Sequence, residues 1–244
     1  MSPDKLESML GYQPLRVRNL TLGITKPGTV AAALMVWGTL TASAVDLDSA
    51  GRDPKYVETI MQRSQKVTDA LKITGTEKGT QVLNIVANRY FKLNDIYSER
   101  DSIKAVAKGL TGDAKKEKME YAEMLKDQKL YKSHFGFIAD LSVYLTDAEV
   151  ETVKDVLTYN VVNVTYTAQC DMIPTLTEEE KVQILAWLKE GREFAIDAES
   201  SKKKHEAFGK YKGRINNWLS KRGYNLTKER EQWAKRVKAR GGTL

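Results

Sequence analysis

Three Thr-x-x-Glu boxes, each followed by apolar residues at helical spacing, restrict the fold of this chain more than any other feature. They are Thr74-x-x-Glu77, Thr146-x-x-Glu149 and Thr177-x-x-Glu180. In such a box the two side chains bond free backbone N–H groups of a helix's first turn, so each box predicts a helix start. Asp53 before Pro54 predicts another start, because proline is tolerated in the first turn. We therefore expect an all-α fold.

The spacing of apolar residues predicts a single domain of several long amphipathic helices. We expect a helix from Asp53 to near Lys72, a long helix from Thr74 towards Gly109 or two with a kink near Ser98, a solvated helix over 111–132, a shorter one from His134 to Leu145, and helices after Thr146 and Thr177. Residues 159–170 are rich in β-branched side chains and favour an extended conformation. Without a second strand as partner, this segment is expected to be an extended loop crossing the helices, or a helix imposed by packing.

The N-terminal region predicts export. Residues 30–40 form an uncharged apolar run, preceded by Lys26 and followed by Ala42-x-Ala44. This order is typical of a secretory signal peptide cleaved after Ala44, and the run is too short to cross a hydrocarbon core of about 30 Å. We expect residues 1–44 to be a preface plus signal peptide that is removed, and 45–244 to be an all-helical periplasmic or extracellular domain without a membrane anchor. The alternative is that the run is a buried element of the folded domain.

Positive charge gathers at the C-terminus. The formal net charge is +7, and residues 200–244 alone hold fourteen Lys and Arg against three Glu. Apolar and aromatic residues at helical spacing, including Phe208, Tyr211 and Trp218, predict that this basic segment forms two amphipathic helices. Its surface either complements the acidic body or binds a ligand. Because an exported chain meets glycans more often than nucleic acid, we expect no nucleic-acid partner.

Two clusters of aromatic, amide and guanidinium side chains are candidates for binding an oligosaccharide. Aromatic faces stack on the C–H faces of sugars, while Asn and Arg bond hydroxyl and carboxylate groups. The expected ligand surface brings the cluster within 88–97, the cluster within 205–224 and His134 into a single pocket: Asn88, Arg89, Tyr90, Asn94, Asp95, Tyr97, His134, His205, Tyr211, Arg214, Asn217 and Trp218. The alternative is structural, with these polar groups satisfying one another inside the fold.

Catalytic and metal motifs give little support to an enzyme. Cys170 is the single cysteine and the two histidines lie far apart in the sequence, so we expect neither a metal nor a cofactor. The sequence has no G-x-S-x-G, P-loop or H-E-x-x-H motif. A glycan-active enzyme, a polysaccharide lyase or hydrolase, needs no local motif. That alternative would place His134, Arg89, Asp95 and Tyr97 near its centre.

Several longer stretches resemble one known family. They are Arg52–Val57, Ala87–Tyr97, Lys132–Phe135, Ile184–Lys189 and Lys203–Asn217. The chain from Arg52 onwards resembles the domain of unknown function 3826 family, which implies an exported, sugar-binding protein of Bacteroidetes and their relatives. We therefore expect a carbohydrate-binding protein associated with polysaccharide utilisation. A glycan-active enzyme and a helical interaction protein without a small ligand are the alternatives.

Overall fold

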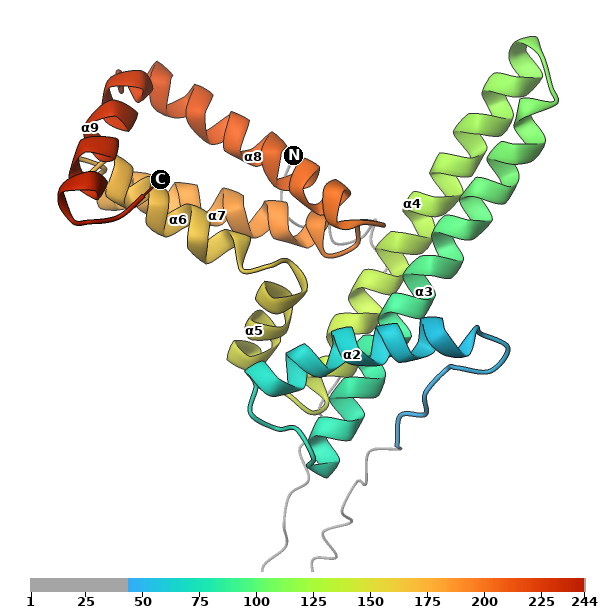
Figure 1. Ribbon diagram of the computed structural model, residues 1–244. Coiled ribbons are helices and arrows are strands. Elements are labelled where there is room, and N and C mark those ends of the chain that lie inside the picture. The colour runs from blue at the N-terminus through green and yellow to red at the C-terminus, as the bar shows by residue number, and fades with distance from the viewer. Residues whose placement is uncertain (1–43, 244) are drawn as a thin grey trace, which may run out of the picture. The chain divides into compact units, whose positions relative to one another are not determined.

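The computed structural model describes residues 44–243, and within them the chain forms eight helices and no strand (Figure 1). The helices are α2 (Pro54–Ala70), α3 (Glu77–Lys108), α4 (Gly112–Ser142), α5 (Asp147–Leu157), α6 (Val161–Met172), α7 (Glu178–Ala195), α8 (Ser201–Lys221) and α9 (Leu226–Ala239). The all-α prediction is confirmed. Apart from Ala44, the predicted preface and signal peptide lie outside the described residues. Among the described helices, none is long and apolar enough to cross a membrane.

Two of the three predicted capping boxes are present. Thr146 and Thr177 each cap a helix, α5 and α7, with the reciprocal bonds of a complete box. The box predicted at Thr74 is wrong, because Thr76 is the residue that caps α3, accepting from the Gly79 N–H at 2.9 Å. The Thr74 hydroxyl instead donates to the Asp69 carboxylate at 2.6 Å and so belongs to the turn after α2.

The two longest helices form an antiparallel hairpin, side by side in Figure 1. α3 continues past Ser98 as one helix, the first of the two possibilities expected there. The separate helices expected over 111–132 and from His134 to Leu145 are wrong, because α4 runs through both as a single helix of 31 residues. No glycine or proline interrupts the sequence at 132–134, and the Ser133 hydroxyl bonds back to the Leu130 carbonyl at 3.1 Å within the helix.

The β-branched segment over 159–170 is helical, so the extended conformation that we expected is wrong and the alternative of a helix imposed by packing holds. Tyr159 and Asn160 adopt positive φ and turn the chain after α5 into α6. Val161 and Val162 are then buried against α7 and α8. Burial of these side chains outweighs the weak strand preference of the segment.

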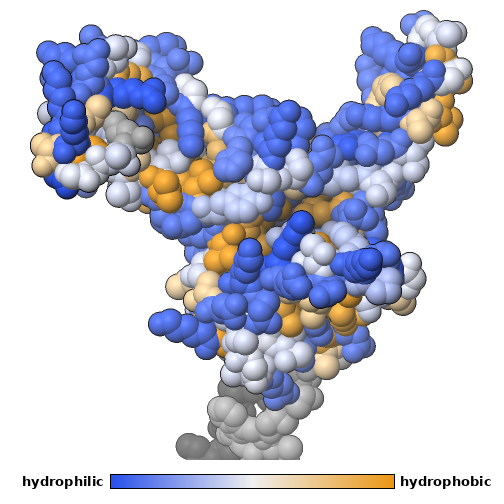
Figure 2. Space-filling view, in the orientation of Figure 1, coloured by the Kyte–Doolittle hydropathy of each residue, from blue (hydrophilic) through white to orange (hydrophobic). Residues whose placement is uncertain are grey.

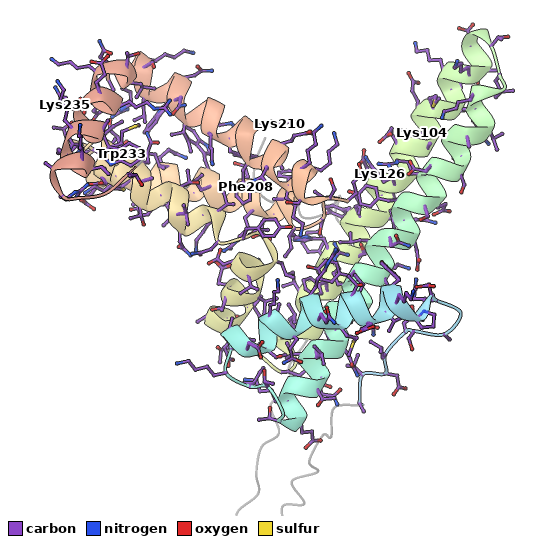
Figure 3. The ribbon with its side chains drawn as sticks, viewed as in Figure 1. Lys104, Lys126, Phe208, Lys210, Trp233 and Lys235 are labelled. Atoms are coloured by element: carbon purple, nitrogen blue, oxygen red, sulfur yellow. The ribbon has the colours of Figure 1, made fainter. Side chains whose placement is uncertain are left out.

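The core has two main clusters. One joins α3, α4 and α5 through residues such as Val86, Leu141 and Val153. The other joins α6, α7 and α8, and Phe208 of α8, labelled in Figure 3, is buried in it. The aromatic residues of the basic segment therefore dock on the body, as its structural interpretation expects. Gly191 permits this docking, because an added Cβ would lie 2.8 Å from the Tyr211 ring.

Replacing Gly191 by alanine should therefore weaken the contact between α7 and α8. We expect Gly191→Ala to lower the free energy of unfolding by about 1–3 kcal/mol through overpacking. Gly209→Ala is the matched control, since Gly209 lies within α8 with open space around it, and alanine there should stabilise by up to about 1 kcal/mol. Urea unfolding followed by circular dichroism measures both. Equal stability of the two variants would contradict this account of the packing.

Candidate functional site

Two of the predicted site residues hold the N-terminal segment on α3. Asn88 donates to the Asp46 carbonyl and accepts from the Asp48 N–H, both at 2.8 Å. Asp95 forms a two-pronged ion pair with Arg52, with both N–O distances 2.9 Å. Asn88 and Asp95 thus fix residues 44–52 in place.

A buried charge cluster joins the hairpin to the link between α7 and α8. Arg89 of α3, whose side chain is 4% exposed, pairs with the Asp197 carboxylate and donates to the Ser133 hydroxyl of α4 at 2.6 Å. His134 of α4 lies with Nδ1 3.0 Å from the same carboxylate. Tyr97 of α3 donates its hydroxyl proton to the Asp197 carbonyl at 2.8 Å. Three predicted residues, Arg89, Tyr97 and His134, therefore meet at Asp197.

His134 carries a positive charge at neutral pH. Its hydrogen bond to Asp197 and a second contact, from Nε2 to Glu193 at 3.4 Å, raise the pKa of His134 to about 9 despite partial burial. Burial raises the pKa of Tyr97 to about 12. Burial opposes ionisation of Glu193, but His134 and Lys154 lower its pKa below the usual value. At neutral pH the cluster is thus a set of ion pairs around a protonated imidazole.

Beside this cluster lies a cleft of about 960 Å³ between the hairpin and the pair of helices α7 and α8. Three exposed aromatic side chains line it: Tyr131 and Phe135 from α4, 68% and 57% exposed, and Phe194 from α7, 63% exposed. Tyr131 and Phe135 are in edge-to-face contact with centroids 4.9 Å apart. The cleft thus offers apolar ring surfaces to a ligand.

The charged side chains around the cleft balance one another. Arg100, Lys104, Lys126, Lys203 and Lys210 line it together with six carboxylates, and Figure 3 shows Lys104 and Lys126 on the hairpin and Lys210 on α8. Glu123 pairs with Lys104 and with Lys126, the second at 2.7 Å, and these hydrogen bonds lower the pKa of Glu123 to about 2. The cleft is therefore rich in hydrogen-bonding groups without a strong excess of either charge.

A second cavity, a pocket of about 610 Å³, adjoins the cleft. Its lining includes the predicted residues Tyr90, Asn94 and Tyr97. Tyr97, Ala198 and Glu199 line both the pocket and the cleft, so they form the wall between the two. Lys204 of α8, a residue that the sequence analysis did not select, also lines the pocket.

Three further predicted residues of α8, Tyr211, Arg214 and Trp218, contact α7 and line neither cavity. Tyr211 donates to Glu190 of α7 at 2.9 Å, and Arg214 pairs with the same carboxylate at 3.2 Å. Trp218 packs edge to face on Trp187 with centroids 5.2 Å apart. Their contacts fasten α8 to α7.

His205 and Asn217 complete the predicted set. The His205 ring is stacked on the Tyr159 ring with centroids 5.6 Å apart. Asn217 is exposed. Of the twelve predicted residues, the cleft and the pocket together contain four: Tyr90, Asn94, Tyr97 and His134.

Comparison with known proteins assigns the chain to a family. Residues 57–239 match the family described as "Protein of unknown function (DUF3826)". The chain belongs to the DUF3826 family. No curated protein matches the chain. The matched range of DUF3826 contains every residue that lines the two cavities except Tyr56. It starts after Arg52, which forms the ion pair with Asp95.

The sequence did not point to several cleft and junction residues of this DUF3826 chain, which lie outside the two predicted ligand-binding clusters. Phe135 and Phe194 fall within runs of apolar residues at helical spacing, a pattern typical of buried positions, yet both are exposed in the cleft. Asp197 comes directly after the last turn of α7, and nothing local marks it as the partner of Arg89, 108 positions away. The one available signal is the pair of aromatic residues at positions 131 and 135, whose spacing of four puts them on one face if a single helix runs through both.

The protonated His134 should make stability depend on pH. The pKa is raised in the folded state from its ordinary value of 6.5 to about 9, so the stabilisation is complete below pH 6.5 and is lost as pH rises through 9. The full effect corresponds to about 3 kcal/mol. We expect wild type to exceed His134→Gln in free energy of unfolding by most at pH 6, with the difference shrinking by pH 10.

Urea unfolding of both proteins across this range measures the difference. Lys204 also titrates in this pH range. Because burial lowers its pKa, its effect on the free energy of unfolding has the opposite sign, but Lys204 is present in both proteins and its effect cancels in the difference. A difference between the two proteins that stays constant from pH 6 to pH 10 would rule out a protonated His134.

Proposed function

We propose that this DUF3826 chain is an exported carbohydrate-binding protein that takes up a neutral oligosaccharide in the cleft, in association with polysaccharide utilisation. The observation that carries the proposal is the aromatic group of Tyr131, Phe135 and Phe194. Five large aromatic side chains are exposed within residues 44–243, and three of them line this one cleft. Exposure of aromatic faces to water costs free energy. This free energy is recovered when the C–H faces of sugars cover the rings.

The charge balance of the cleft supports a neutral ligand. A polyanion such as nucleic acid needs a continuous excess of Lys and Arg, whereas the cleft has five such residues against six carboxylates. Paired carboxylates and ammonium groups of this kind supply both acceptors and donors for sugar hydroxyls.

The enzyme alternative receives less support from the same residues. A lyase or hydrolase that used His134 as its general base would need that imidazole to take up a proton at neutral pH, whereas its pKa of about 9 keeps it protonated between two carboxylates. Asp95 is occupied by Arg52, and Tyr97 bonds a backbone carbonyl with a pKa raised to about 12. The arrangement therefore favours binding over acid–base chemistry.

The interaction-protein alternative has one observation in its favour. Val106 and Met124, each 63% exposed, lie towards the far end of the hairpin, where Figure 2 shows apolar side chains. A second protein could cover this surface. The apolar side chains at the hairpin end are interspersed with exposed Lys and Glu, whereas the cleft gathers three exposed aromatic rings beside hydrogen-bonding groups, so the cleft carries the proposal.

Export is part of the proposal and is supported by the contacts of Val45, the residue that cleavage would make the N-terminus. The Val45 N–H donates to Gln81 at 2.6 Å, and the Val45 carbonyl accepts from Asn84 at 2.8 Å. Cleavage after Ala44 would leave these contacts with α3 in place.

We expect N-terminal sequencing of the protein from a cell's periplasmic or secreted fraction to begin at Val45. Recovery of the intact chain from the cytoplasm alone would contradict export.

Titration calorimetry with a panel of neutral oligosaccharides tests the binding site. We expect at least one to bind, and Tyr131→Ala, Phe135→Ala or Phe194→Ala each to weaken it about three- to tenfold, through lost stacking of about 0.5–1.5 kcal/mol. Tyr121→Ala is the matched control, because Tyr121 is an exposed α4 tyrosine that does not line the cleft. Absence of binding by every sugar, or equal effects of Tyr121→Ala and the cleft variants, would contradict the proposal.

A further inference from the structure

The pocket beside the cleft gathers positive charge. Arg63 and Lys66 of α2 and Lys204 of α8 line it, together with one carboxylate, Glu199. Glu199 is engaged by Arg100 at 2.7 Å from outside the pocket lining. Within residues 44–243, no carboxylate forms an ion pair with any of the three cations. The pocket therefore has an uncompensated positive charge.

Lys204 is the cation whose position most needs explanation. Its residue is 6% exposed, and its ammonium group donates to the Leu157 carbonyl at 2.7 Å. It lies 5.9 Å from the ring centre of Tyr90 and 5.7 Å from that of Tyr159. A buried ammonium with no carboxylate in ion-pair contact is costly, and burial lowers the pKa of Lys204 to about 8 although the charge of Asp197 opposes this shift.

A structural role accounts for only part of this arrangement. Leu157 is the last residue of α5, so the bond from Lys204 satisfies a carbonyl at the negative end of that helix. An ammonium group has three donors, and this bond uses one. Arg63 and Lys66, which have no bond to α5, bring further positive charge to the same cavity.

The rest of the lining is suited to a sugar-sized ligand. The pocket volume of about 610 Å³ is within the range of small-molecule sites and much larger than an inorganic anion needs. Tyr56, Tyr90 and Tyr159 present aromatic rings and hydroxyl groups, and Asn94 and Ser201 add short polar side chains. These groups can bond several hydroxyls of one ring.

We infer that this pocket binds an acidic monosaccharide unit, a uronic acid, with its carboxylate between Lys204 and Arg63 and its hydroxyls against the tyrosines, Asn94 and Ser201. The choice of a sugar rests on the function proposed for the adjoining cleft, whereas the choice of an anion rests on the charges of the pocket alone. The two cavities share Tyr97, Ala198 and Glu199 as a common wall and so lie next to each other. An oligosaccharide with one acidic unit could therefore reach both.

Titration calorimetry of the full chain with D-glucuronate, D-glucose and inorganic phosphate tests the inference. We expect glucuronate to bind at least tenfold more tightly than either glucose or phosphate. Lys204→Met should weaken glucuronate at least tenfold, and Arg63→Gln, at an exposed position where folding is unaffected, should weaken it several-fold. Lys202→Met is the matched control, because Lys202 is an exposed α8 lysine that does not line the pocket.

Proton linkage gives a second readout that a purely structural role would not produce. A bound carboxylate favours the ammonium form of Lys204, so binding near pH 8.5 should take up a fraction of a proton, and affinity should fall as pH rises from 7 to 9.5. The other charged and titratable groups that face Lys204 are Arg63 from α2, Arg89 and Tyr90 from α3, Tyr159 before α6 and Asp197 after α7. Calorimetry in two buffers of different ionisation enthalpy measures the uptake, which Lys204→Met should abolish.

Failure of this inference is distinguishable from failure of the proposed function. No binding of glucuronate, binding equal to that of glucose, tighter binding of phosphate, or equal losses in Lys202→Met and Lys204→Met would each overturn it. The cleft variants Phe135→Ala and Phe194→Ala should leave glucuronate affinity unchanged. If the wild-type chain binds glucuronate but none of the neutral oligosaccharides, the cleft proposal alone is overturned.

Discussion

The ion pair between Arg89 and Asp197 is the interaction on which the rest of the described structure depends. It lies where the α3–α4 hairpin meets the link between α7 and α8, and it is almost fully buried on the arginine side. Breaking a buried pair leaves an uncompensated charge, so either partner without the other would be strongly destabilising. His134 and the Tyr97 hydroxyl bond to the same residue, so both helices of the hairpin are fixed to one short link.

The link of five residues, 196–200, has a different role at nearly every position. Ile196 is buried in the core cluster that joins α3, α4 and α5, and Asp197 forms the ion pair with Arg89. Ala198 and Glu199 separate the cleft from the pocket, and Ser200 caps α8. The two cavities therefore exist because the ion pair holds this link against the hairpin. The aromatic cleft and the cationic pocket on its two sides are the basis of the proposed sugar-binding function.

Local sequence signals predicted the helices far better than the site. The boxes at Thr146 and Thr177 are local, with partners three residues apart, and both hold. Residues 159–170 carry a weak strand preference, and packing of Val161 and Val162 against distant helices reverses it. The residues that line the two cavities could not all be predicted for a similar reason: Lys204 looks like part of an ordinary charged face and Phe194 like an ordinary core position until the fold brings them to the cavities. Long-range pairs such as Arg89 with Asp197 leave no mark at either position in a single sequence.

A double-mutant cycle on Arg89→Met and Asp197→Asn, measured by urea unfolding at pH 7, tests the central claim most directly. If the ion pair organises the junction, each single variant is strongly destabilised, and the double variant is less destabilised than the sum of the two. We predict a coupling free energy of about 2 kcal/mol or more. A coupling below about 0.5 kcal/mol, the size found for independent positions, would contradict the account.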